Sequence, residues 1–155
     1  LEKLVNPAMS ELPAFLAPNG GLNSGMMIVQ VAAASLVSEN KILSHPASVD
    51  SIPTSADKED HVSMGTISAR KFGKIVKNSE NVVAMEFLCG AQAIGMLSPL
   101  KPSAGVLAAY DVIRDSVPYA ETDRVFSKDI EAIKNLIRNH QLLGSVVNRV
   151  GELEL

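Results

Sequence analysis

The residue types that could do acid–base chemistry gather in one polar stretch of the sequence. Residues 44–64, SHPASVDSIPTSADKEDHVSM, hold two histidines, four carboxylates and five serines between two apolar segments. Carboxylates and imidazoles can move protons during a reaction, and the free backbone amides at a helix start can bind an anion. The stretch therefore predicts either an active-site loop that runs into a helix, or a loop whose serines and acids only cap that helix.

Other reactive side chains form no catalytic or metal-binding pattern. The three histidines, His45, His61 and His140, do not stand at metal-ligand spacing, and Cys89 has no CxxC partner. Neither a GxSxG nucleophile turn nor a phosphate-binding glycine pattern is present. The sequence therefore predicts no metal site, and Cys89 is expected to be an unreactive thiol of the core. A single cysteine also excludes an internal disulfide, which fits a reducing, cytoplasmic location.

The bulk composition predicts a helical protein without nucleic-acid or membrane partners. The 155 residues are 46% hydrophobic but only 4% aromatic, so Ala, Val, Ile, Leu and Met must build the core, and these residues favour close helix–helix packing. A net charge of −3 indicates no basic surface for nucleic acid or anionic lipid. The longest apolar run, residues 26–37, is shorter than the roughly 18–20 residues of a membrane-spanning helix.

The polar stretch must be positioned by the segments that precede it. Pairs of Pro, Gly and Asn through residues 1–23 predict a loop, and the apolar residues within it indicate that this loop is ordered. A helix is expected from Asn23 or Ser24 to residue 44. Its first part, residues 26–34, is apolar nearly all round, which predicts burial on every side.

A second and much longer helix is expected to follow the polar stretch. Ser55 or Asp57 could cap it, and loosely spaced apolar residues continue the pattern to about Leu97. Glu59 and Asp60 would then lie in its first turn, where acids complement the positive end of the helix dipole. A helix of this length exceeds the usual globular range and indicates a helical bundle.

Two shorter helices complete the expected fold. One is predicted over residues 104–115, before Pro118, and the last is predicted to begin at Ser127 and to carry an apolar stripe as far as Leu143. Together these patterns predict an all-α fold, with long near-parallel helices that form part of an oligomeric helical bundle. The expected divisions are an ordered loop (1–23), central long helices (24–97) and shorter C-terminal helices (98–155).

Three segments resemble the family of histidine and phenylalanine ammonia-lyases. Residues 4–16, LVNPAMSELPAFL, resemble its NPxxSGLPAFL segment, and residues 81–94, NVVAMEFLCGAQAI, resemble one of its helices. Between them, residues 21–71 closely resemble the histidine ammonia-lyase form of the family, above all in PASVDSIPTSA and EDHVSM. The resemblance covers roughly residues 4–97, and its motifs are long and specific.

This resemblance implies an enzyme that eliminates ammonia from L-histidine to give urocanate, in histidine catabolism. The family forms homotetramers with a many-helix core, and its active sites combine residues from more than one subunit. Its electrophile is a methylidene-imidazolone that forms from an Ala-Ser-Gly triplet, and a base removes a β-proton while ammonia leaves. No Ala-Ser-Gly triplet occurs here, and the family's catalytic Tyr and substrate-binding Arg fall in earlier parts of the full chain.

The chain is accordingly expected to be the C-terminal portion of such an enzyme. It begins with Leu1 rather than Met, in a context typical of the middle of an element, which favours a fragment, a cleaved product or one part of a split enzyme. Its expected partners are the N-terminal portion of the same enzyme and further copies in a tetramer. Because it lacks the electrophile, the isolated chain is expected to be inactive.

One catalytic residue carries over from the family motif. The acid of the family's QEDH segment falls on Glu59, where the resemblance implies contact with the substrate's imidazole. Asp60 and His61 continue the motif and are expected to support Glu59 without touching the substrate. Asp57 and Lys58 replace two neutral amides of the family's Ser-Ala-Asn-Gln-Glu.

These replacements leave two alternatives open. One is another methylidene-imidazolone enzyme, such as a tyrosine or phenylalanine ammonia-lyase or an aminomutase. The other is a non-catalytic helical assembly subunit that derives from this fold.

Overall fold

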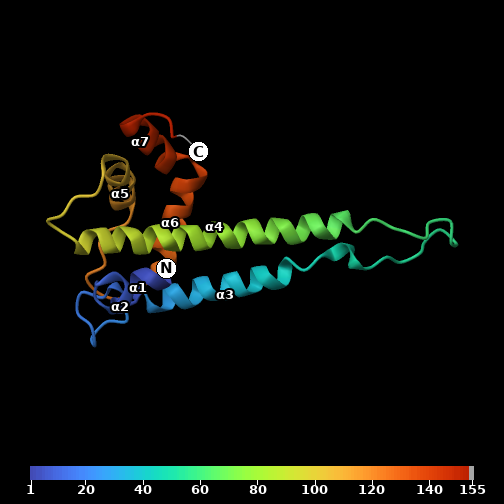
Figure 1. Ribbon diagram of the computed structural model, residues 1–155, viewed down its shortest axis with the longest axis horizontal. Coiled ribbons are helices and arrows are strands. Elements are labelled where there is room, and N and C mark those ends of the chain that lie inside the picture. The colour runs from blue at the N-terminus through green and yellow to red at the C-terminus, as the bar shows by residue number, and fades with distance from the viewer. Residues whose placement is uncertain (154–155) are drawn as a thin grey trace.

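Helices account for every long element of the protein, as its Ala-, Leu- and Met-rich composition predicts. The computed structural model describes residues 1–153, and within that range the only β-type pairings are two isolated bridges. The elements, labelled in Figure 1, are the helices α1 (Glu2–Val5), α2 (Pro7–Ser10), α3 (Met27–Leu43), α4 (Gly65–Met96), α5 (Ala104–Ser116), α6 (Phe126–Arg138) and α7 (Gln141–Val150), with the 3-10 turns η1 (Ala14–Leu16) and η2 (Ala47–Val49).

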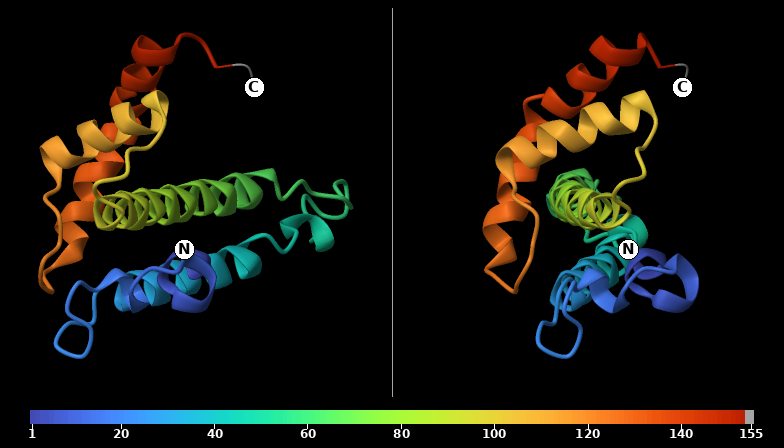
Figure 2. Two further views of the ribbon diagram at one scale, coloured as in Figure 1. Left: turned by 60° about the vertical axis from the view of Figure 1, so that its left-hand side comes forward. Right: turned by 90° about the vertical axis from the view of Figure 1, so that its left-hand side faces the viewer.

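Helices α3 and α4 lie side by side and antiparallel (Figures 1 and 2). At one end they are joined by the polar loop, residues 45–64. Polar contacts align them near that loop: the Asn78 amide donates to the Glu39 carboxylate at 2.8 Å and to the Asn40 side chain at 3.0 Å. The ammonium of Lys71, on α4, donates to the backbone carbonyl of His45, just beyond α3. These contacts fix where the polar loop begins and ends.

The C-terminal helices pack on the other end of α4. Helices α5 and α7 lie on the side of α4 away from α3, and α6 crosses it (Figure 2). Their shared core contains Leu88 and Cys89 of α4 with Ile113 and Ile133, each at most 2% exposed. Arg138 of α6 also makes a two-pronged ion pair with Glu80, and hydrogen bonding from that guanidinium is the main cause that lowers the pKa of the Glu80 carboxyl.

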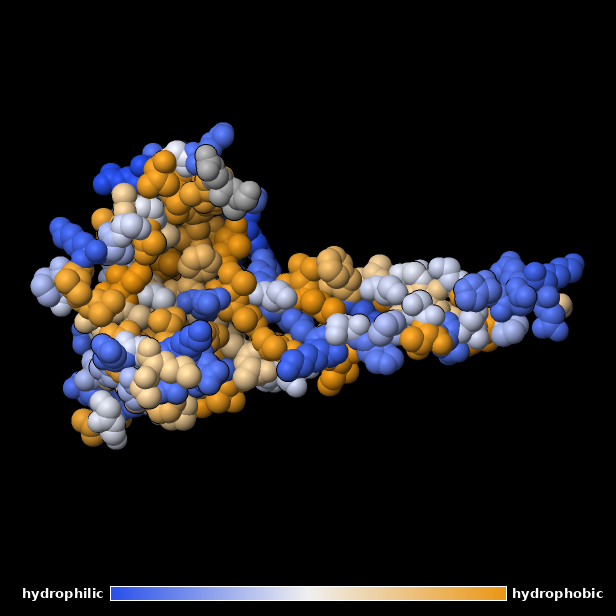
Figure 3. All heavy atoms as spheres, viewed as in Figure 1, coloured by the Kyte–Doolittle hydropathy of each residue, from blue (hydrophilic) through white to orange (hydrophobic). Residues whose placement is uncertain are grey.

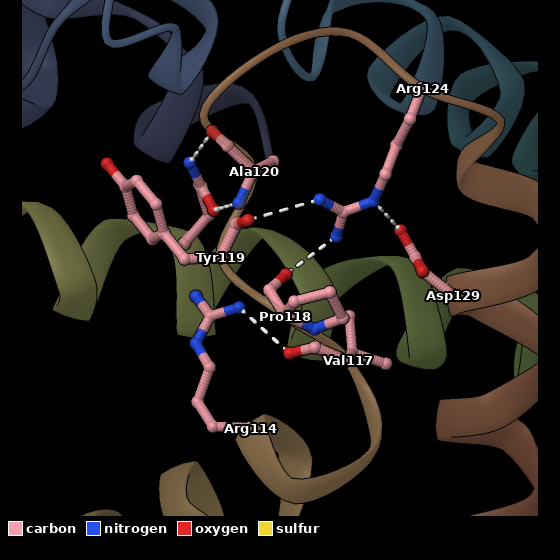
Figure 4. A network of polar contacts seen from close by, with 8 residues as sticks. Arg114, Val117, Pro118, Tyr119, Ala120, Arg124 and Asp129 are labelled. Carbon is pink, nitrogen blue, oxygen red and sulfur yellow. Dashed lines mark hydrogen bonds and ion pairs between the residues drawn. The ribbon is translucent and has the colours of Figure 1, made fainter.

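A polar network fixes the segment that joins α5 to α6 (Figure 4). Gln92 of α4 is 1% exposed; its amide donates to the carbonyl of Ala120 at 2.9 Å, and its oxygen accepts from the Ala120 N–H at 3.1 Å. Arg124 donates to the carbonyls of Pro118 and Tyr119 and pairs with Asp129 at 2.8 Å. A segment without regular structure, buried at Val117 and Ala120, thus finds partners for backbone groups of both residues and of their neighbours.

The same segment also binds the start of α3. Both oxygens of the Asp123 carboxylate accept backbone N–H groups, from Ser24 and Gly25, each at 2.8 Å. Gly25 has φ +54°, and a Cβ there would lie 2.5 Å from the carbonyl oxygen of Phe15. The Asp123 carboxylate thus binds the backbone just before α3, which begins at Met27 with Met26 as its N-cap, so the expected side-chain cap from Asn23 or Ser24 is absent within the described range.

Two further helix boundaries differ from the sequence prediction. The prediction that α4 is capped by Ser55 or Asp57 is wrong, because α4 begins at Gly65. The last predicted helix is in fact two, α6 and α7, because His140 adopts a left-handed conformation (φ 55°) that interrupts the helical hydrogen bonding. The helix predicted over 104–115 is confirmed, with one more residue at its end.

Burial of the first long helix on every side was also a wrong prediction for this chain. Ile28 is 66% exposed and Val31 is 58% exposed, because only α4 and the N-terminal turns pack against α3. Apolar atoms remain visible along the α3–α4 pair, whereas hydrophilic atoms gather at its free end (Figure 3). The large exposed apolar side chains of the two helices are Ile28, Val31, Val37, Ile42, Ile67, Phe72, Val76 and Val83.

Among residues 1–153, no helix combines the length and the hydropathy that crossing a membrane would require.

The first prediction concerns the buried amide of Gln92. Gln92→Leu would leave the N–H and carbonyl of Ala120 buried without partners, so we expect the free energy of unfolding to fall by about 3 kcal/mol. Urea denaturation followed by circular dichroism measures this change. Gln141→Leu, the same substitution at an exposed position of α7, should change it by less than about 0.5 kcal/mol. Equal effects of the two substitutions would contradict the stabilising role of the Gln92–Ala120 pair.

The second prediction concerns the thiol of Cys89. Burial raises its pKa from 9.0 to about 12, so the reactive thiolate is absent near neutral pH. We expect iodoacetamide to label the native chain at least a hundredfold more slowly than the urea-unfolded chain, as mass spectrometry would show. Between pH 9 and 12 the unfolded state binds fewer protons than the folded state, so the free energy of unfolding should fall with rising pH. Rapid labelling of folded protein would contradict this burial.

Candidate functional site

The polar loop projects from the free end of the α3–α4 pair. It spans residues 45–64 and lies at the end of α4 opposite to the C-terminal helices (Figure 1). The turn η2 begins it, after Pro46 prevents α3 from continuing. Every residue from 52 to 61 is exposed. The chain therefore presents this loop to its surroundings and does not bury it against its own core.

Two cross-links close the loop into a narrow hairpin-like arm. Nearer its base, the hydroxyl of Ser51 accepts the backbone N–H of Val62 at 2.9 Å. Further out, Thr54 and Glu59 form an antiparallel bridge, with N–H···O distances of 2.9 Å from Thr54 to Glu59 and 3.3 Å in the reverse direction. Glu59 thus has a fixed backbone position just behind the tip.

The tip itself is a turn of unusual backbone conformation. Ser55, Ala56 and Asp57 have φ values of 59°, 54° and 66°, in the left-handed region. Each such residue costs about 1–2 kcal/mol when it carries a Cβ. The N–H of Lys58 donates to the carbonyl of Ser55 at 3.3 Å and closes the turn. The residues expected to cap α4 therefore reverse the chain direction instead, which carries Glu59 and Asp60 away from the first turn of the helix.

The carboxylate of Glu59 has one partner within the described chain. The hydroxyl of Thr54 donates to its Oε2 atom at 3.3 Å, and no cation of residues 1–153, Lys58 included, lies within ion-pair distance. An exposed carboxylate with an unused oxygen can accept a hydrogen bond from an imidazole N–H, or a proton. The local geometry therefore suits an acid–base or ligand-orienting role.

The other two predicted site residues lie beside Glu59 without contacting it. Asp60 and His61 are exposed, and no side chain or backbone group within the described range forms a hydrogen bond with theirs. A cavity of about 200 Å³ at the base of the loop is lined by Pro46, Lys71 and other residues, and Glu59 is not among them. The loop brings the three predicted residues together in sequence order but does not enclose them.

An arginine held between two tyrosines is a feature that sequence reasoning missed. The guanidinium of Arg114 lies 5.3 Å from the ring centre of Tyr110 and 5.5 Å from that of Tyr119, and its Nη1 atom donates to the Val117 carbonyl at 3.3 Å. Gly95 leaves room for the Tyr119 ring, which lies 2.9 Å from where a Cβ would stand. The spacing of Tyr110 and Arg114, one helical turn apart, was the available signal.

The arginine cluster serves packing and lies at the opposite end of α4 from Glu59. Two guanidinium nitrogens of Arg114, Nε and Nη2, are buried without a hydrogen-bond partner among residues 1–153. Burial is the main cause that raises the pKa of Tyr119. Stacking against the rings places the cation over their negative faces, which partly offsets its loss of hydration.

Residues 1–153 hold no group of side chains placed as metal ligands, and the sequence lacks the triplet that forms the family's organic electrophile. In the part of the chain that the structure describes, no three His, Cys, Asp or Glu side chains group as metal ligands would. The sequence contains no Ala-Ser-Gly triplet, from which a methylidene-imidazolone forms. The residues present therefore do not build that group, and no chemical step is assigned to it within this chain.

Comparison with known proteins identifies relatives across the whole chain. Residues 1–115 match the family model for aromatic amino acid lyases. The chain is 53% identical over 154 residues to the histidine ammonia-lyase of Symbiobacterium thermophilum, which covers 99% of this chain and 30% of that protein. With the histidine ammonia-lyase of Myxococcus xanthus it shares 52% identity over 146 residues, or 94% of this chain and 29% of that protein.

Solved structures agree with this similarity. The crystal structure of histidine ammonia-lyase from Trypanosoma cruzi matches 97% of this chain with a TM-score of 0.92 and 48% identity, and the match covers 30% of that chain. Tyrosine aminomutase from Streptomyces globisporus matches 98% of this chain with a TM-score of 0.91 and 32% identity, covering 29% of that chain. The protein thus spans about 30% of the length of these relatives, and it belongs to the aromatic amino acid lyase family.

Proposed function

We propose that this chain is the C-terminal portion of a histidine ammonia-lyase, which eliminates ammonia from L-histidine without oxidation to give urocanate. The observation that carries the proposal is the 53% identity to a named histidine ammonia-lyase across 99% of the chain. The placement of Glu59 supports it, because the arm presents this carboxylate outward, where a substrate held by other parts of the enzyme can meet it.

In this proposal Glu59 binds the imidazole of the substrate. A carboxylate oxygen accepts the N–H of an imidazole and thereby sets the orientation of the ring, and it can also take up a proton. Asp60 and His61 stand beside Glu59 on the arm and support its position from outside the substrate contact. The phenylalanine ring offers no hydrogen-bond donor to this carboxylate, and the tyrosine ring offers a phenolic O–H in place of an N–H, so the carboxylate discriminates more sharply against phenylalanine than against tyrosine.

The rest of the reaction belongs to the part of the enzyme outside these residues. The methylidene-imidazolone supplies the electrophile of the family's reaction, and an Ala-Ser-Gly triplet elsewhere in the enzyme must form it. This chain contributes the carboxylate of Glu59, carried on an arm whose backbone is held by two cross-links. We therefore expect the isolated 155 residues to be inactive.

The exposed apolar side chains of α3 and α4 support a further part of the proposal, assembly into a homotetramer. Apolar faces of this extent are covered in stable proteins, and the N-terminal portion of the enzyme and neighbouring subunits are the proposed covers. The left-handed turn of residues 55–57 fits the same arrangement, because strained backbone persists where surrounding structure holds it. A cytoplasmic location is also proposed, since the single cysteine fits a reducing compartment.

A second candidate is an aminomutase or lyase that acts on tyrosine or phenylalanine. The similarity to tyrosine aminomutase, at 32% identity and a TM-score of 0.91, favours it, as do Asp57 and Lys58, which place two charges directly before Glu59. The products that the complete, unsubstituted enzyme forms from histidine, tyrosine and phenylalanine separate the two candidates. Cinnamate or coumarate from the complete enzyme, without urocanate, would support the second candidate.

The third prediction tests the role of Glu59 in the complete lyase that contains these residues. Glu59→Gln keeps the shape of the side chain but removes its charge and its capacity to take a proton, so we expect kcat for L-histidine to fall about a hundredfold or more. Urocanate formation, followed by absorbance, measures this rate. Glu121→Gln, at an exposed acid beyond the far end of α4, is the matched control and should leave kcat unchanged. An unaltered rate in Glu59→Gln would exclude Glu59 from the reaction.

The fourth prediction concerns assembly of the isolated chain. Because Ile28, Phe72 and Val76 expose at least half of their surface, we expect self-association in sedimentation velocity experiments at micromolar concentration. Phe72→Lys combined with Val76→Lys should shift the distribution toward monomer. The control, Thr66→Lys combined with Ser79→Lys at exposed polar positions of the same helix, should not. A clean monomer of the unmodified chain would contradict the proposed role of these faces.

A further inference from the structure

We infer that Thr54 is a positioning residue, which holds the carboxylate of Glu59 in the orientation that meets the substrate. The inference rests on the proposed function, since it assigns a second residue to the site where Glu59 is proposed to act. Thr54 does not touch the substrate in this scheme. It acts only through Glu59.

Three hydrogen bonds link the two residues, and they fix different parts of Glu59. The paired backbone bonds, 2.9 Å and 3.3 Å long, hold the peptide groups of Glu59 and Thr54 opposite each other. The third bond runs from the Thr54 hydroxyl to Oε2 of Glu59 at 3.3 Å. The backbone bonds fix the position of the Glu59 backbone, and the Thr54 hydroxyl influences the orientation of the Glu59 carboxylate.

The hydroxyl matters because nothing else in the described chain restrains that carboxylate. A glutamate side chain has several rotatable bonds, and an exposed one samples many conformations. Its polar neighbours Lys58, Asp60 and His61 make no hydrogen bond or ion pair with its side chain within residues 1–153. At 3.3 Å this bond is longer than the roughly 2.5–2.7 Å of a strong hydroxyl–carboxylate bond. Thr54 therefore biases the orientation of the carboxylate before the substrate arrives and does not lock it.

The bond also leaves the second carboxylate oxygen free. Thr54 donates to Oε2, and Oε1 has no hydrogen-bond partner among residues 1–153, on an arm whose residues from 52 to 61 are all exposed. An imidazole N–H can therefore bind to Oε1 while Oε2 stays anchored. Preorganisation of this kind raises the effectiveness of a catalytic group without adding any contact to the substrate.

Kinetics of the complete lyase with a graded set of substitutions tests the inference. Thr54→Val keeps the shape and β-branching of Thr54 but removes the donor, and we expect kcat/KM for L-histidine to fall about tenfold. Thr54→Ser keeps the hydroxyl and should stay within twofold of the unmodified enzyme. Thr66→Val, the same chemical change at an exposed position on α4, is the matched control and should have no effect. Sedimentation should give the same assembly for all three variants.

A double-mutant cycle then separates positioning from a structural effect on the loop. If Thr54 acts through the Glu59 carboxylate, Thr54→Val should lower kcat/KM by less than twofold in a Glu59→Gln background. A merely structural role would produce the same tenfold loss in both backgrounds, and that result would overturn the inference. So would an unimpaired Thr54→Val enzyme.

The outcomes for Glu59 and Thr54 can be told apart. A strong effect of Glu59→Gln with no effect of Thr54→Val removes only the positioning role and leaves the proposed function in place. No effect of Glu59→Gln removes the proposed role of Glu59, and with it the inference about Thr54.

Discussion

The uneven burial of α4 is the constraint on which the rest of the structure depends. All of its buried residues lie between Ala84 and Ala93, where α1, α3, α5 and α6 pack around it, and no residue from 65 to 83 is buried. A helix of 32 residues is about 48 Å long. The C-terminal end of α4 is therefore buried in a core. Its N-terminal end extends outward, packs mainly against α3 and leads into the polar arm.

Polar contacts between segments that are far apart in the chain stabilise the packing around the C-terminal end of α4. Gln92 holds Ala120, Asp123 holds the backbone before α3, and Arg124 ties the same segment to Asp129. The Gln92 bonds satisfy buried backbone groups of Ala120 that would otherwise be unpaired at a cost, whereas the Asp123 bonds lie nearer the surface. The joining segment of residues 117–125 thereby links α3, α4 and α6, although it contains no helix or strand of its own.

The arm presents the proposed site residue Glu59 without enclosing it. Its two cross-links and its left-handed turn fix the backbone around Glu59, while every residue from 52 to 61 stays exposed. A carboxylate in this setting is presented rather than enclosed. Under the proposed function, the exclusion of water that catalysis needs comes from structure that packs around the arm, and this fits a chain that spans about 30% of its relatives' length.

Local sequence signals determined much of this protein: its helical class, the helix of residues 104–116, the end of α3 before Pro46 and the family to which the polar stretch belongs. These follow from propensities and motifs that act over a few neighbouring residues. Tertiary structure alone decided that Asp123 binds the backbone just before α3, that His140 divides the last helix, and that the polar stretch forms an arm which pairs Thr54 with Glu59. The serines and acids of that stretch match the start of a helix as well as a turn, because local preferences for the two are similar. In the folded chain the turn is accompanied by the cross-links of Thr54 with Glu59 and of Ser51 with Val62, which single-residue preferences do not reveal.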